Sequence, residues 1–88
     1  MSEGNVMNDV IYVFNGKDIT MTVCLQIRAV VDVLQKWLNI DFMEAIDLFY
    51  LSDTYQSMQD VRNGLWAESA EYIADQVLEE TGRTSAAV

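Results

Sequence analysis

The stretch "FMEAIDLFYLSDTYQSMQD", residues 42–60, decides the fold because it contains two helix starts and neither glycine nor proline. Asp41 stands just before it, and Glu44 follows three residues later, which is an acidic variant of the capping box. Ser52 offers a second helix N-cap in the middle of the stretch. The sequence therefore predicts two short helices that meet at a bend at Ser52.

Apolar spacing indicates which sides of these two helices face a core. In the first, which we expect to run to about Leu51, side chains three and four residues apart should point inward. In the second, Tyr55 and Met58 should be the anchors. The inward side chains of the first helix are expected to be Phe42, Ala45, Ile46, Phe49 and Tyr50.

Longer helices are predicted on both sides of this stretch. The first, residues 22–38, carries the apolar stripe Val23, Ile27, Val30, Leu34 and Trp37, widened by Cys24, Val31 and Leu38. The last should begin near Ser69 and end at Gly82, with the apolar face Ala70, Ile73, Ala74, Val77 and Leu78. Between them, Asn63-Gly64 predicts a turn that returns Leu65 and Trp66 to the core.

The N-terminal part leaves two alternatives open. In residues 10–23, two β-prone runs flank Asn15-Gly16, a dipeptide that accepts the positive φ angles of a type I′ turn. This pattern predicts a β-hairpin. In the competing interpretation Asp18 caps the first helix and only residues 10–14 are extended.

The length of 88 residues predicts one domain with one core. We expect a mainly α fold, a small bundle of three to four helices with the short N-terminal hairpin as an addition. Residues 22–81 would form the helical core, and residues 1–9 and 83–88 would be flexible tails.

Fourteen acids against five bases give a net charge of −9, which would repel a phosphate backbone and favours a protein partner with a basic surface. No apolar run approaches the roughly 20 residues that cross a bilayer, so we expect no membrane insertion. The single cysteine and the absence of a secretory signal predict a cytoplasmic protein.

The residue types argue against an enzyme, a cofactor site and a metal site. The chain has no histidine, which is the commonest general base and a common zinc ligand. Cys24 has no histidine to activate it and is expected to be buried as a small hydrophobe. Residues 53–64 fail as a calcium loop because Met58 occupies the position of the turn glycine, and no glycine-rich phosphate loop is present.

Two groups of side chains are candidates for binding a protein partner. The acids Glu68, Glu71, Asp75 and Glu79, joined by Glu80, share one side of the last predicted helix. The aromatic residues Tyr50, Tyr55, Trp66 and Tyr72 are too many for a core of this size to hide completely. The acids alone would also suit a solvated helix face, and the aromatics would suit core lining or a homodimer contact.

The blocks "FMEAIDLFYLSDTY" and "SAEYIADQVLEE" resemble a family of small uncharacterised bacterial proteins, often encoded beside or fused to ADP-ribosyltransferase-like toxin domains. The resemblance covers roughly residues 22–80. Relatives tend to have a histidine before the second block, where this chain reads "GLWAES", so no role of that histidine carries over. The matching positions are Glu44, Ala45, Ile46, Phe49, Tyr50, Ser52, Tyr55, Ser69, Tyr72, Ile73, Ala74, Leu78 and Glu80.

The resemblance implies a non-catalytic, antitoxin-like or regulatory partner of a bacterial effector. Together with the charge pattern, it predicts that the acidic last helix and the corner from Tyr50 to Tyr55 bind that effector. The alternative is a phage-type nucleic-acid mimic that blocks the basic groove of a host defence protein. An enzyme with paired carboxylates would instead require a concave pocket in which one carboxyl pKa is strongly raised.

Overall fold

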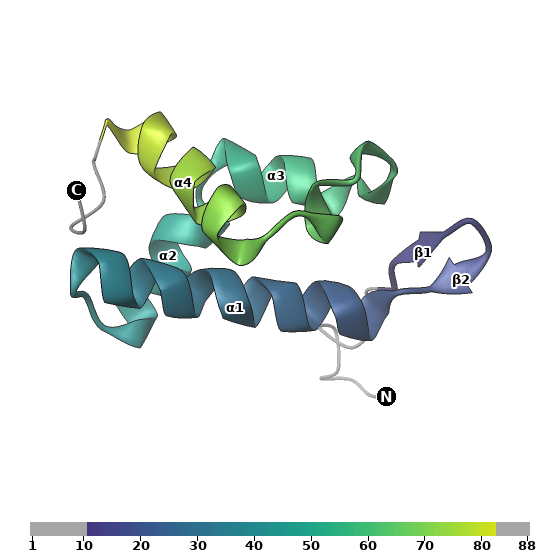
Figure 1. Cartoon of the computed structure of the whole chain (residues 1–88), viewed down its shortest axis with the longest axis horizontal. Coiled ribbons are helices and arrows are strands. Elements are labelled where there is room, and N and C mark those ends of the chain that lie inside the picture. The colour runs from purple at the N-terminus through teal and green to yellow at the C-terminus, as the bar shows by residue number, and fades with distance from the viewer. Residues whose placement is uncertain (1–10, 83–88) are drawn as a thin grey trace, which may run out of the picture.

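The computed structural model describes residues 11–82, which form four α-helices and a short antiparallel hairpin (Figure 1). This arrangement confirms the expected mainly α class. The expected tails, residues 1–9 and 83–88, lie outside the described residues. In chain order the elements are β1 (Val13–Phe14), β2 (Lys17–Asp18), α1 (Thr20–Leu38), α2 (Phe42–Tyr50), α3 (Asp53–Gln59), the 3₁₀ turns η2 (Val61–Asn63) and η3 (Leu65–Ala67), and α4 (Ala70–Thr81).

The long helix α1 is the base on which the other helices pack. It contacts both α2 and α4, and α3 joins the bundle through its own contacts with α2 and α4. Figure 1 shows α1 along one edge of the molecule, with α3 and α4 side by side on the opposite edge. One core lies between them, and each large aliphatic or aromatic side chain buried there contributes about 1.5–3 kcal/mol. Its buried members are Val23, Val30, Val31, Leu34, Ala45, Phe49, Met58, Ile73, Ala74, Val77 and Leu78.

The N-terminal segment adopts the first of the two predicted alternatives, the hairpin. Asn15 (φ 53°) and Gly16 (φ 80°) both have the positive φ of a type I′ turn, which confirms the hairpin, with Val13 paired to Asp18. The strands have two residues each, and α1 already begins at Thr20. The Asp18 carboxylate accepts a hydrogen bond from the Thr20 amide at 2.9 Å, but Asp18 lies in β2 and the N-cap of α1 is Ile19, so the alternative with Asp18 as the helix cap is wrong.

The predicted helix boundaries in the deciding stretch are confirmed. The Asp41 carboxylate accepts from the Glu44 amide at 2.8 Å, and the Ser52 hydroxyl accepts from the Tyr55 amide at 3.0 Å. Asn39, in the left-handed conformation with φ 55°, ends α1 before the first of these caps. The chain therefore bends at Ser52, as its side chain predicted.

Three side chains expected in the core are exposed. Ala45 and Phe49 of α2 are buried, but Phe42 and Tyr50 are exposed at the edge of the same stripe. The thiol of Cys24 is also exposed, so its expected burial is wrong. All three lie at a margin: Phe42 and Tyr50 are the first and last residues of α2, and Cys24 borders the buried stripe of α1.

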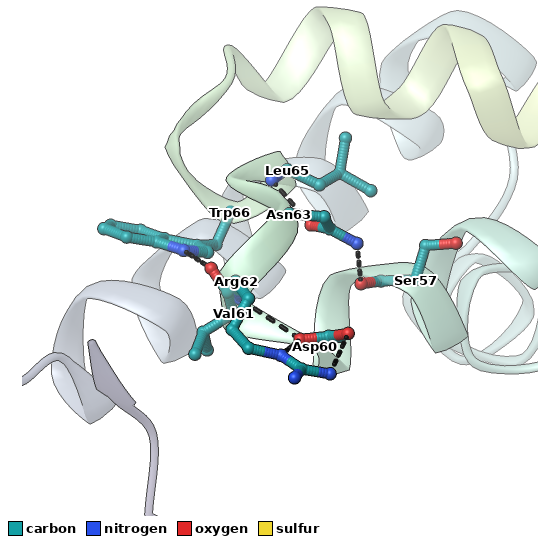
Figure 2. Close-up of polar contacts among 7 residues, drawn as sticks. All are labelled: Ser57, Asp60, Val61, Arg62, Asn63, Leu65 and Trp66. Carbon is teal, nitrogen blue, oxygen red and sulfur yellow. Dashed lines mark hydrogen bonds and ion pairs between the residues drawn. The ribbon is translucent and has the colours of Figure 1, made fainter. Parts of the chain in front are cut away.

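The segment before α4 is held by a small polar network (Figure 2). Gly64 has a φ of 77°, which confirms the predicted turn, and the Asn63 side chain accepts from the Leu65 amide and donates to the Ser57 carbonyl. Trp66 donates its indole N–H to the Val61 carbonyl at 2.8 Å. Leu65 and Trp66 are thereby packed against the core as half-buried side chains.

Helix α4 begins and ends as its sequence predicted. The Ser69 hydroxyl accepts from the Tyr72 amide at 3.0 Å, and Gly82 is the left-handed C-cap with a φ of 74°. Of the five residues expected on its apolar face, Ile73, Ala74, Val77 and Leu78 are buried, while Ala70 is half-buried at the first turn. The acids of α4 lie on the opposite, exposed side of the helix.

Candidate partner-binding surface

The acids predicted on one side of α4 are all exposed: Glu71, Asp75 and Glu79 on the helix and Glu68 just before it. Residues 63–82 contain these four acids and Glu80 but no base. The ion pairs found within residues 11–82, Arg28–Asp32 and Arg62–Asp60, use none of them. This side of α4 is therefore a negative surface that the described part of the chain does not neutralise.

Two adjoining hollows border this surface and share Asp53 and Glu80, and we call them together the acidic groove. The first, of about 440 Å³, lies between α3 and α4 and is lined by Asp53, Thr54, Ser57, Leu65, Tyr72, Gln76, Glu79 and Glu80. The second, of about 460 Å³, reaches α2 and is lined by Glu44, Asp47, Leu48, Leu51, Ser52, Asp53, Glu80 and Thr81. Their walls hold five acids and no base, with leucine and tyrosine side chains between the acids.

Glu80 connects the two hollows and has a structural task as well. Its carboxylate accepts the backbone N–H groups of Asp53 at 2.6 Å and Thr54 at 2.7 Å, and it also bonds the Thr54 hydroxyl. The first N–H groups of a helix have no partner within the helix, and its N-terminus attracts negative charge. Glu80 thus caps α3 from another helix, with its charge held in a fixed place.

This role of Glu80 was missed by the sequence reasoning, which grouped it with the solvated acids of α4. Local helix-capping patterns extend over three or four residues, whereas Glu80 acts on residues 26 and 27 positions earlier. The signal that the sequence does contain is Ser52, which marks the start of α3 but satisfies only the Tyr55 amide. The first two amides of α3, those of Asp53 and Thr54, therefore needed another acceptor.

The aromatic rings of Tyr50 and Tyr55 form a second site, which we call the tyrosine corner together with Tyr12. Tyr50 stacks on Tyr55 with centroids 4.7 Å apart, and Tyr55 meets Phe49 edge-on at 5.2 Å. The Tyr12 hydroxyl donates a hydrogen bond to the Gln59 side chain. Burial raises the pKa of both Tyr12 and Tyr55 above the ordinary tyrosine value. The rings of Tyr50 and Tyr55 and the hydroxyl group of Tyr12 therefore already have partners within the chain.

The structure divides the eight predicted site residues among three places. Glu71, Tyr72, Asp75 and Glu79 lie on α4 and Glu68 just before it, and of these Tyr72 and Glu79 line the groove. Tyr50 and Tyr55 belong to the tyrosine corner. Trp66 packs edge-to-face on Phe14, with ring centroids 5.6 Å apart, at the hairpin end of the molecule.

Helix α3 separates the groove from the corner. Its residues Thr54 and Ser57 line the groove, while Tyr55 and Gln59, on its other side, lie at Tyr12. Successive residues of an α-helix project about 100° apart, so neighbours in sequence face different sides. The acidic groove and the Tyr50–Tyr55 corner therefore lie on different sides of α3, although the last helix and the corner were both predicted to bind the effector.

The carboxyl groups with a clearly shifted pKa lie away from the groove. A hydrogen bond from the Thr20 side chain lowers the pKa of Asp18, and a hydrogen bond from Arg62 lowers that of Asp60. Within residues 11–82, no group of three or more histidine, cysteine, aspartate or glutamate side chains is placed to hold a metal ion. In the same range no helix has both the length and the apolar character to cross a membrane.

Comparison with protein-family models, with curated proteins and with solved structures found no match for the chain.

Proposed function

We propose that the protein is a non-catalytic interaction module that binds a basic segment of a partner protein in the acidic groove. The observation that carries this proposal is the composition of the groove, whose walls hold Glu44, Asp47, Asp53, Glu79 and Glu80 without a base. The acid row Glu68, Glu71 and Asp75 extends the negative surface beyond the groove.

The groove suits the side chains of lysine and arginine in particular. These side chains lay an aliphatic stem along apolar surface and keep the charged end near water or an acid. Leu48, Leu51, Leu65 and Tyr72 would contact the stems, while Glu79 offers its carboxylate at the rim. The fixed carboxylate of Glu80 adds negative charge at the centre, which needs no ordering when the partner arrives.

Several weak contacts would add up to the binding energy. An exposed ion pair contributes about 0–1 kcal/mol, so a single basic side chain is not enough. A segment with several bases would be drawn in by the field of the acids, and the association rate should fall as salt screens it. The partner is then a protein with a clustered basic surface.

The resemblance to proteins encoded beside ADP-ribosyltransferase-like toxin domains favours a bacterial effector as that partner. The proposed role is antitoxin-like or regulatory: the module restrains the effector by occupying a basic surface that the effector needs. The single cysteine of the chain is in keeping with a cytoplasmic setting for such a complex.

The test compares capture of partners from the native host by two variants with the same net charge. Asp75→Asn/Glu79→Gln removes two negative charges from the acidic surface, and Ile11→Lys/Val13→Lys adds two positive charges at exposed positions of the hairpin end. We expect the first variant to capture at least tenfold less partner than wild type, and the second to capture as much as wild type. Equal capture by wild type and the first variant would contradict the proposal.

Competition by DNA distinguishes the proposed interaction module from the alternative, a nucleic-acid mimic. A nucleic-acid mimic would occupy a groove that DNA also occupies, so duplex DNA would displace it from its partner. For the proposed module, a lysine- and arginine-rich peptide competes and DNA does not. Displacement by DNA would contradict the proposed module and support the phage-type mimic.

A further inference from the structure

A second surface lies on α1, on the side of this helix that faces solvent. Met21 is 70% exposed and Leu25 63% exposed, one turn apart, and the Cys24 thiol is exposed beside them. Arg28 and Asp32 continue the same side of the helix. The Arg28 guanidinium lies over the ring of Phe42 from α2, 5.9 Å from its centroid. We call these six residues the α1 outer face.

The apolar area of this face is comparable to the largest apolar patch of a typical monomer. Met21, Leu25 and Phe42 together leave on the order of 400 Å² exposed, if each free side chain presents about 150–250 Å². The largest apolar patch on a typical monomer is about 300–600 Å² and is often functional. A standard interface buries about 800 Å² per partner, which is more than this apolar area, so a contact through this face should be weak.

A hollow beside the face gives it a shape that can receive a side chain. This hollow, of about 570 Å³, lies between α1 and the η3 turn and shares Leu25 with the outer face. Met21 and Leu25 form a ridge along its edge, and helices pack by placing the ridges of one into the grooves of the other. The full lining is Thr22, Leu25, Gln26, Ala29, Trp66 and Ala67.

Trp66 and Ala67 are held in place as the far wall of this hollow. The Gln26 side chain donates to the Trp66 carbonyl at 3.1 Å and also bonds the Glu68 carbonyl. The Trp66 indole N–H is bound to Val61 on its other side. Because both ends of the segment are fixed to the chain, the hollow exists before anything enters it.

Charge indicates what covers the face. Arg28 and Asp32 form an exposed ion pair at 3.6 Å, so the face is neutral, whereas the rest of residues 11–82 carries eleven acids and three bases. A basic partner has no reason to choose a neutral face over the acidic groove. Two copies of this chain repel each other over most of their surface and can approach through this face without bringing like charges together.

We infer that the protein forms a weak symmetric dimer in which the α1 outer faces of two copies meet. In such a contact the same patch serves both partners, so the ridge of Met21 and Leu25 on each copy enters the hollow of the other. Arg28 and Asp32 can exchange partners across the contact. In Figure 1, α3 and α4 lie on the edge opposite α1, which leaves both acidic grooves open in the dimer.

The experiment measures the mass of the full chain by sedimentation equilibrium from about 1 to 500 μM. A contact near the lower limit of specific interfaces should give a dissociation constant on the order of 10–100 μM. Wild type should therefore pass from monomer to dimer within this range. A wild-type mass that stays at the 10.0 kDa of one chain at every concentration would overturn the inference.

Two matched variants locate the contact. Leu25→Glu places a charge in the centre of the face, and Leu51→Glu makes the same change at a residue that is 87% exposed in the acidic groove. Leu25→Glu should weaken the dimer at least tenfold, and Leu51→Glu should leave it as in wild type. Both replace exposed side chains, and circular dichroism checks that they fold. Equal dimer constants for Leu25→Glu and wild type would also overturn the inference.

Discussion

The acidic groove and the tyrosine corner lie on opposite sides of α3 and differ in what the chain does with their side chains. Tyr72 at the groove is 49% exposed and Tyr50 at the corner is 42% exposed, so exposure alone does not distinguish them. Tyr50, however, is stacked on Tyr55, whereas Tyr72 has no aromatic partner among the described residues. A side chain is therefore available to a partner when its own chain leaves it without contacts.

The largest expected effect comes from removing the support of the corner. Phe49 is fully buried beneath Tyr50 and Tyr55, and its truncation to alanine leaves a cavity that the corner cannot fill. We expect Phe49→Ala to lower the free energy of unfolding by about 3–5 kcal/mol, measured by urea denaturation. Phe49→Leu is the conservative control and should cost clearly less. A loss below 1 kcal/mol in Phe49→Ala would contradict a close-packed corner.

An intermediate effect on stability is expected for Glu80 but not for its neighbour in the groove, Glu79. Glu80→Ala removes the acceptor of two backbone N–H groups and should lower the free energy of unfolding by about 1–2 kcal/mol. Glu79→Ala removes an exposed acid from the same groove and should change it by no more than about 0.5 kcal/mol. Thermal and urea unfolding of the two variants provide the comparison. Equal losses would show that Glu80 does not cap α3.

The smallest expected effect concerns the hydroxyl groups of the corner. Burial raises the pKa of Tyr12 and Tyr55, so the folded state holds their protons more tightly than the unfolded chain. This contribution to stability is complete below the unfolded pKa near 10 and is lost as pH rises through the folded pKa. The unfolding free energy should therefore decline above about pH 10, and less steeply in Tyr12→Phe. The same slope in both proteins would contradict this role of Tyr12.

At neutral pH the same variant should lose about 1 kcal/mol, since the Tyr12 hydroxyl no longer bonds Gln59. Tyr72→Phe removes a hydroxyl at the groove and should leave the free energy of unfolding within about 0.5 kcal/mol of wild type. Urea unfolding at pH 7 measures both. The two variants thus compare the corner and the groove through the loss of one hydroxyl group at each.

The sequence was sufficient for those parts of the fold that depend on neighbouring residues. The caps at Asp41, Ser52 and Ser69 each act on an amide three residues away, and the turns at Asn15-Gly16 and Asn63-Gly64 depend on φ angles that these residues tolerate. Short-range chemistry of this kind can be read directly from the order of residues. The mainly helical class followed from it.

The candidate site was predicted less completely because it depends on how the helices meet. Apolar spacing identified the buried stripes of α1 and α2 but not their limits, and Cys24 of α1 and Phe42 of α2 proved to be exposed. The acids of α4 were correctly expected on its exposed side. The groove beside them is formed by residues from three helices, and nothing in the sequence of one helix indicates it.

The cap that Glu80 supplies has a consequence for the order in which the molecule assembles. Helix α3 has seven residues, fewer than an isolated helix needs in water, and its first amides obtain their acceptor only when a loop of about 27 residues has closed. We therefore expect α3 to be completed at the same folding step that docks α4. In the native protein the two helices should open as one unit, so that hydrogen exchange at the Asp53 and Thr54 amides reports the departure of α4.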